Sequence, residues 1–290
     1  MERSDLWLLL AGAIAASVNA AAGGGTLLSF PSLIALGLSP LAANATSTVG
    51  LLPGSIASVW AYRRELRALR GEGILILIPA LIGGALGAVL LLQLGGRVFE
   101  RVVPILLLFS AALLALQPVL NRMLQRRAGD APQPASGALA ATTGTTGTTG
   151  TTGTTGTTGT TGTTGTTAGL APAVAVVLVL SVYAGYFGAG VGILFLGAMG
   201  LVLSRPLGEL NALKVLSAAA ANGIGAATLA LLEWRHPTGS LRFRSAIPLA
   251  CGAILGGYFG ARVVKKLPAW ALRAFASGVG VAIALWLALR

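Results

Sequence analysis

Lys214 is the strongest candidate for a chemical role in this 290-residue chain, because it lies inside the apolar segment 209–231. A cation placed in lipid costs about 2.5–3.5 kcal/mol on insertion scales, so its ammonium group needs a cavity or a partner. Two explanations remain open from the sequence. Lys214 pairs with Glu209 or reaches the membrane surface, or it neutralises a bound anion.

Polar residues share the helix face that carries Lys214. Asn211 and Asn222 lie three residues before and eight residues after it, and both spacings return to one side of an α-helix. A shift of 167 positions places Asn44, Ser47 and Ser55 on the corresponding face of an earlier segment. We expect these two stripes either to converge on one binding site or to join helices within the membrane.

Glycine runs precede both stripes. Gly23, Gly24 and Gly25 interrupt the first half of the chain, and Gly190 and Gly192 interrupt the second. Such breaks leave backbone N–H groups free at a helix N-terminus, which attracts oxyanions, although small residues also serve close helix packing. The predicted substrate-binding residues are Gly23, Gly24, Gly25, Thr26, Asn44, Ser47, Gly190, Gly192, Asn211, Lys214 and Asn222.

The elements that must position these residues are membrane helices. The chain is 55% hydrophobic and 10% charged, whereas a soluble domain carries roughly 25% charged residues. Basic residues cluster beside apolar segments, which is typical of membrane proteins and argues against nucleic-acid binding for a net charge of +12. The predicted segments are 6–22, 26–38, 42–62, 73–95 and 101–120, then 171–187, 190–203, 209–231, 245–264 and 269–289. We therefore predict an all-α, polytopic integral membrane protein.

The two sets of segments predict an internal repeat. We divide the chain into a first membrane repeat at 1–127, a flexible Thr/Gly-rich linker at 128–169 and a second membrane repeat at 170–290. The segments 26–38 and 190–203 are short, and short glycine-interrupted segments at matching places mark transporter binding sites. If each half crosses five times, the halves are inverted; if each short pair makes one broken crossing, the halves are parallel. The arginines of 63–70 and 121–127 predict a cytoplasmic side for these connectors.

Groups needed for catalysis are scarce. The chain has one cysteine and one histidine, and none of its eight acidic residues lies mid-segment. An enzyme active site, a metal site and an obvious proton relay are therefore not expected, and no cofactor is implied.

Two stretches carry a family resemblance. AAAGGGTLLSFPSLIALGLSPLAANATS at 20–47 and the weaker copy YAGYFGAGVGILFLGAMGLVLSRPLGELNALK at 183–214 resemble the duplicated motif of the sulfite exporter TauE/SafE family. The second copy departs from the first, since Ala198 stands where Pro31 would align. The resemblance implies a multi-pass exporter of sulfite, sulfoacetate or related organosulfonates in the inner membrane. Its expected partners are a small anion and the lipid bilayer, and a homo-oligomer is compatible with it. A permease for another anion and a non-transporting membrane scaffold remain alternatives.

Overall fold

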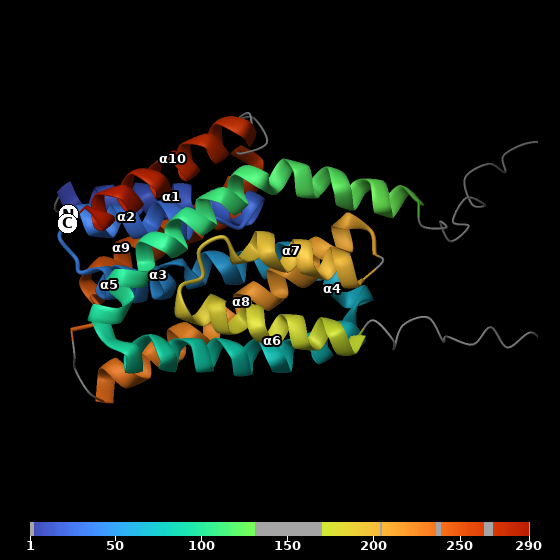
Figure 1. Ribbon diagram of the computed structural model, residues 1–290, viewed down its shortest axis with the longest axis horizontal. Coiled ribbons are helices and arrows are strands. Elements are labelled where there is room, and N and C mark those ends of the chain that lie inside the picture. The colour runs from blue at the N-terminus through green and yellow to red at the C-terminus, as the bar shows by residue number, and fades with distance from the viewer. Residues whose placement is uncertain (1–2, 131–169, 204, 236–238, 264–268, 290) are drawn as a thin grey trace, which may run out of the picture.

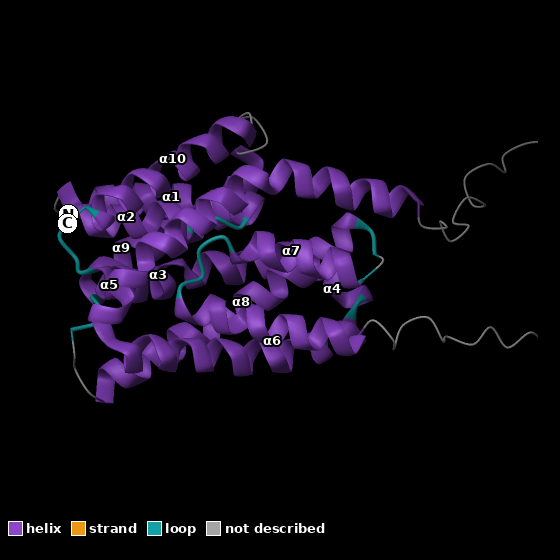
Figure 2. Ribbon diagram, in the orientation of Figure 1, coloured by secondary structure: helices purple, strands orange, loops and turns teal. Residues whose placement is uncertain are grey.

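The computed structural model describes residues 3–130, 170–203, 205–235, 239–263 and 269–289. These residues form helices and short connections with no strand (Figures 1 and 2). The all-α prediction is therefore confirmed for the part of the chain that is described. The linker predicted at 128–169 lies outside the described residues except for 128–130, which belong to a helix.

The first half contains the five predicted segments and one additional short helix. Its helices are α1 (Arg3–Ala22), α2 (Thr26–Ala35), α3 (Pro40–Ala61), α4 (Arg63–Ala68) and α5 (Arg70–Asp130). The helix α5 combines two predicted segments, but Gly95 breaks it with φ 70° and ψ 175°. At this glycine the chain reverses direction (Figure 1). The α3 helix begins where Ser39 accepts a hydrogen bond from the Ala42 N–H and proline occupies the first turn.

The second half follows the same order of helix lengths. It contains α6 (Leu170–Tyr186), α7 (Val191–Val202), α8 (Leu207–Arg235), α9 (Phe243–Val263) and α10 (Ala269–Ala288). The second helix is again the short one, with 12 residues in α7 and 10 in α2. Each half thus begins with a helical hairpin whose returning arm is too short to cross a bilayer on its own.

The two hairpins enter the molecule from opposite ends. In Figure 1, α1 begins and α10 ends at one end, while α5 ends and α6 begins at the other. The helix α2 doubles back beside α1, and α7 doubles back from α6. The two halves therefore have inverted orientations, which resolves the alternative that the sequence left open.

The halves are interlaced rather than placed side by side. The first helix of each half packs against a long helix of the other half. The helix α1 packs along α9, and α6 packs along the first part of α5. Glycine permits this contact: a Cβ at Gly252 would lie 1.9 Å from the Leu9 carbonyl oxygen, and one at Gly87 would lie 2.1 Å from the Val182 carbonyl oxygen. Close backbone contact of this kind is typical of helices that associate within lipid.

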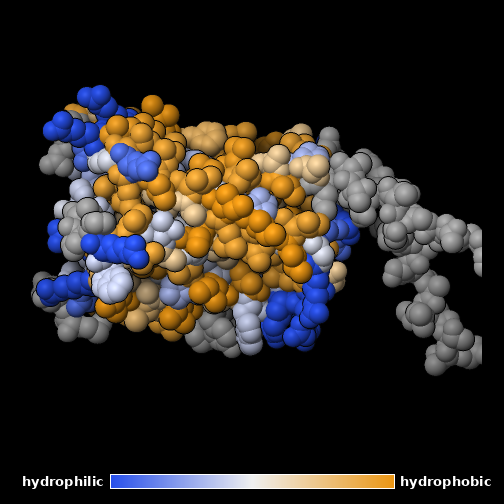
Figure 3. Space-filling model, turned by 90° about the horizontal axis from the view of Figure 1, so that it is seen from below, coloured by the Kyte–Doolittle hydropathy of each residue, from blue (hydrophilic) through white to orange (hydrophobic). Residues whose placement is uncertain are grey.

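The outer surface suits a bilayer. Figure 3 shows a hydrophobic band across one face, with hydrophilic residues gathered toward its two ends. Large apolar side chains such as Ile78, Ile105 and Val179 are more than half exposed. Residues 70–126 and α8 are apolar and long enough to cross a membrane, and other apolar helices of the described chain are shorter. Exposed apolar area on this scale has no place in a soluble monomer, so lipid covers it.

Candidate functional site

The tips of the two hairpins meet at a pair of glycines. A Cβ on Gly23 would lie 2.7 Å from the Gly192 Cα, and a Cβ on Gly192 would lie 2.8 Å from the Gly23 Cα. Gly23 also has a positive φ of 76°, which disfavours any residue with a side chain. The predicted breaks at Gly23 and Gly192 are therefore among the points at which the two halves touch backbone to backbone.

Each hairpin tip opens into the N-terminus of a short helix. Gly25 precedes α2 and Gly190 precedes α7, and neither helix start is capped by a side chain. The first N–H groups of an α-helix have no partner within the helix and carry partial positive charge. Val191 and Gly192, the first residues of α7, line a small cavity beside the tips.

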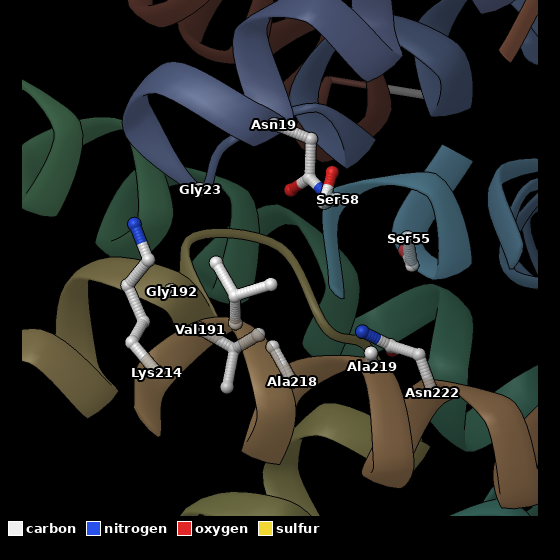
Figure 4. Close-up of a pocket in the computed structure, with 11 residues that line it drawn as sticks. Asn19, Gly23, Ser55, Ser58, Val191, Gly192, Lys214, Ala218, Ala219 and Asn222 are labelled. Atoms are coloured by element: carbon white, nitrogen blue, oxygen red, sulfur yellow. The ribbon is translucent and has the colours of Figure 1, made fainter. Parts of the chain in front are cut away.

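The cavity lies between four helices and one hairpin tip (Figure 4). Its volume is about 20 Å³, enough for about one water molecule. The walls come from α1, the α1–α2 tip, α3, α7 and α8. Their residues are Asn19, Gly23, Ser55, Ser58, Val191, Gly192, Lys214, Val215, Ala218, Ala219 and Asn222.

Lys214 is the charged group of this cavity. Its side chain is only 4% exposed, and it has no hydrogen bond or ion pair with any described residue. Figure 4 shows its ammonium group extending from α8 toward the tip at Gly23. A buried charge without a counterion is poorly solvated, so a negative ligand at this point would stabilise it.

Glu209 does not supply the missing counterion. Its carboxylate accepts a 3.4 Å hydrogen bond from Arg205, and Arg205 also pairs with Glu72 of α5. The structure therefore does not support the alternative in which Lys214 pairs with Glu209. The burial of Lys214 likewise argues against a side chain that reaches the membrane surface.

The structure brings four of the predicted residues together and places the others elsewhere. Gly23, Gly192, Lys214 and Asn222 line the cavity. The remaining seven are outside its walls: Gly24, Gly25, Thr26, Asn44, Ser47, Gly190 and Asn211. Among these, Asn211 donates to the Leu207 carbonyl oxygen at 2.9 Å, within its own helix. A direct substrate contact for these seven is not supported by this geometry.

The stripe on α3 takes part in helix packing where it carries Asn44 and Ser47. Both side chains are fully buried. The Asn44 amide donates to the Tyr186 carbonyl oxygen at 2.9 Å, and the Ser47 hydroxyl lies 2.6 Å from that of Ser29. These contacts match the explanation in which polar side chains join helices in lipid.

Three polar lining residues were not among the predicted set, namely Asn19, Ser55 and Ser58. A signal existed for Ser55, since it corresponds to Asn222 at the 167-residue offset. Asn19 is polar within the first apolar segment, four residues before Gly23, and its carbonyl oxygen accepts from the Gly23 N–H at 2.9 Å. Ser58 shares one helix face with Ser55. Among the described residues, no group of three or more His, Cys, Asp or Glu side chains could hold a metal ion.

Part of this chain is similar in sequence to curated membrane proteins. A probable membrane transporter protein of Haemophilus influenzae is 32% identical over 102 residues, which cover 35% of this chain and 40% of the relative. The probable membrane transporter protein YfcA of Escherichia coli K12 is 32% identical over 109 residues, covering 37% of this chain and 40% of the relative. The chain thus spans about 40% of the length of the curated relatives that it matches. No solved structure is significantly similar to it. The sulfite exporter TauE/SafE family matches residues 8–287, and the chain therefore belongs to this family.

Proposed function

We propose that this protein exports small sulfur-containing oxyanions, such as sulfite or organosulfonates, across the cytoplasmic membrane. The observation that supports this most strongly is Lys214, an unpaired ammonium group buried in a cavity at the contact between two inverted hairpins. The start of α7, which no side chain caps, lies on the same wall, and a helix N-terminus carries partial positive charge. The family match supports the sulfur-oxyanion class.

Export requires the cavity walls to move apart. A volume of about 20 Å³ holds about one water molecule, which is less than the four heavy atoms of sulfite require. Inverted repeats supply such motion in other transporters, where one half rocks against the other around a fixed central site. We propose that the Gly23–Gly192 contact is the place where the two halves separate to admit the anion.

The membrane potential suffices to drive such an exporter. Moving one negative charge out of a cell that is negative inside is favoured by about 2.3 kcal/mol per 100 mV. None of the residues lining the cavity is acidic, so the site holds no carboxylate that would relay protons. Facilitated efflux of the anion, driven by the potential, fits this set of residues.

The test is labelled sulfite flux in proteoliposomes that carry a defined potential. The wild-type protein is expected to accelerate flux over protein-free vesicles, and Lys214→Met is expected to reduce it to nearly that background. Arg122→Met removes an exposed positive charge outside the cavity and serves as the matched control, with flux near wild type.

Four results would contradict the proposal. Equal flux through Lys214→Met and wild type would show that Lys214 does not bind the transported anion. Flux that does not depend on the membrane potential but follows a pH gradient would show that transport is coupled to protons, not driven by the potential. Wild-type vesicles that pass no sulfite but pass another anion would favour a permease of different substrate, and vesicles that pass none would favour a scaffold.

A further inference from the structure

The charge balance of the cavity bears on the charge of its ligand. Of the eleven residues that line the cavity, Lys214 alone is ionisable at neutral pH. The other polar walls are neutral, from Asn19 on α1, Ser55 and Ser58 on α3, and Asn222 on α8. A ligand of charge −1 would therefore form a neutral pair with the ammonium group.

Charged groups on the neighbouring helices do not change this balance. The α4 helix carries Arg63, Arg64, Glu65 and Arg67, the start of α5 carries Arg70 and Glu72, and the start of α8 carries Glu209. The nearby loop carries Arg205, and α6 carries Tyr183 and Tyr186. None of these side chains lines the cavity. A doubly charged ligand would leave a net negative charge in a buried site, where solvation is poor.

The serine hydroxyl groups of the wall bear on whether the ligand carries a proton. The Ser55 hydroxyl donates to the Leu51 carbonyl oxygen at 3.3 Å, and the Ser58 hydroxyl donates to the Gly54 carbonyl oxygen at 2.9 Å. With both serine protons engaged in these bonds, the lone pairs left on the two oxygens can accept a hydrogen bond. An oxyanion that keeps a proton can donate to them, and a fully deprotonated oxyanion cannot.

We infer that the cavity selects singly charged oxyanions, namely hydrogen sulfite and monosulfonates, over dianions such as sulfite, sulfate and sulfoacetate. This inference rests on the proposed function and narrows its substrate class. It assigns Lys214 the selection of charge, and it assigns Ser55 and Ser58 a preference for hydrogen sulfite over monosulfonates, which carry no proton to donate.

The experiment compares anions of different charge in one preparation of wild-type proteoliposomes. Methanesulfonate is singly charged over the whole useful pH range, sulfate and sulfoacetate are doubly charged at neutral pH, and sulfite changes between the two forms near neutrality. We expect methanesulfonate to inhibit labelled sulfite flux at concentrations at least tenfold below those of sulfate or sulfoacetate. Sulfite flux should fall with rising pH as the hydrogen sulfite fraction falls.

Methanesulfonate flux over the same pH range controls for titration of the protein, and protein-free vesicles control for passive leakage of sulfur dioxide. Sulfate or sulfoacetate inhibiting as strongly as methanesulfonate would overturn the inference while leaving anion export intact. Sulfite flux that rises with pH would do the same. Sulfite flux and methanesulfonate flux that both equal those of protein-free vesicles would overturn the proposed function and this inference with it.

A variant with a second positive charge sharpens the result. Asn222→Lys places another ammonium group on the cavity wall, and we expect it to shift preference toward sulfate by about tenfold relative to methanesulfonate. An unchanged preference in a folded variant would contradict selection by charge balance. If this variant does not fold, the anion series on the wild-type protein decides the question.

Discussion

Two corresponding regions of the repeat differ in what surrounds their polar side chains. Lys214 on α8 and Ser47 on α3 are related by the 167-residue offset, yet Lys214 borders a cavity without a partner while Ser47 lies 2.6 Å from the Ser29 hydroxyl. Both side chains are buried. The comparison teaches that two positions related by the repeat can have different surroundings, since one borders a cavity and the other is a packing contact.

Aromatic rings extend the packed region beyond Ser47. Phe30 lies edge-on to Phe187 at 5.8 Å between ring centroids, and Phe99 lies 6.0 Å from Phe187 and 5.7 Å from Tyr186. All four rings are at least nine-tenths buried. No comparable ring cluster lines the Lys214 cavity, whose apolar walls are Val191, Val215 and two alanines.

Exchanging the two corresponding residues should have the largest effect. Ser47→Lys places an ammonium group in a packed region and removes the bond to Ser29, so we expect a loss of about 3–5 kcal/mol in unfolding free energy. Lys214→Ser should leave the fold intact and reduce anion flux about 10- to 100-fold, the worth of one charge-assisted hydrogen bond. Chemical denaturation and vesicle flux measure the two effects. Recovery of flux in the double variant would show that the two positions are interchangeable. That result would contradict the difference in surroundings described above.

The contact between the hairpin tips should be the next most sensitive feature. Gly23→Ala combines an unfavourable φ with a collision against the Gly192 backbone, and we expect it to cost about 2–4 kcal/mol. Gly37→Ala is the matched control, because Gly37 has φ 84° but no neighbouring atom within 4 Å of the added Cβ. It should show the backbone cost alone. Thermal unfolding in detergent measures both, and equal losses would mean that the tips do not pack as closely as described.

The aromatic region should respond more weakly and only in stability. Phe187→Leu removes two ring contacts, which are worth about 0.5–1.5 kcal/mol each. The expected loss is therefore about 1–3 kcal/mol, with anion affinity unchanged because Phe187 does not line the cavity. A change in the anion concentration for half-maximal flux would connect the packed region to the binding site and weaken the contrast between them.

The smallest effect is expected at Glu209. Its carboxylate is one-third exposed and pairs with Arg205 at 3.4 Å, and exposed ion pairs contribute about 0–1 kcal/mol. Glu209→Gln should therefore leave both stability and flux close to wild type. A large loss of flux would restore the explanation in which Glu209 acts as the partner of Lys214.

The sequence predicted the helices well because their signal is local. Apolar length and glycine breaks depend only on neighbouring residues, so α1–α3 and α6–α10 appear close to their predicted ranges. The separate helix α4 was missed because six residues with three arginines lack an apolar run. The inverted orientation was also undetermined, since charge counts could not show whether each short helix doubles back.

The site was predicted only in part, because a helix face does not reveal what lies opposite. Asn211 and Asn222 lie on one helix face, yet Asn211 bonds to its own helix and Asn222 borders the cavity. The offset grouped Asn44 and Ser47 with Ser55, but only Ser55 lines the cavity. That distinction depends on the crossing of α3 and α8 and on the contact between the two hairpin tips, which are tertiary features.

The most direct test of the account is the thermal stability of wild type and Lys214→Met with and without a singly charged oxyanion. Without anion, Lys214→Met should melt at the higher temperature, because removing an unpaired buried charge relieves its desolvation cost. Added methanesulfonate should raise the melting temperature of the wild type and leave that of Lys214→Met unchanged. Equal stabilisation of both proteins by the anion would contradict the claim that Lys214 binds it.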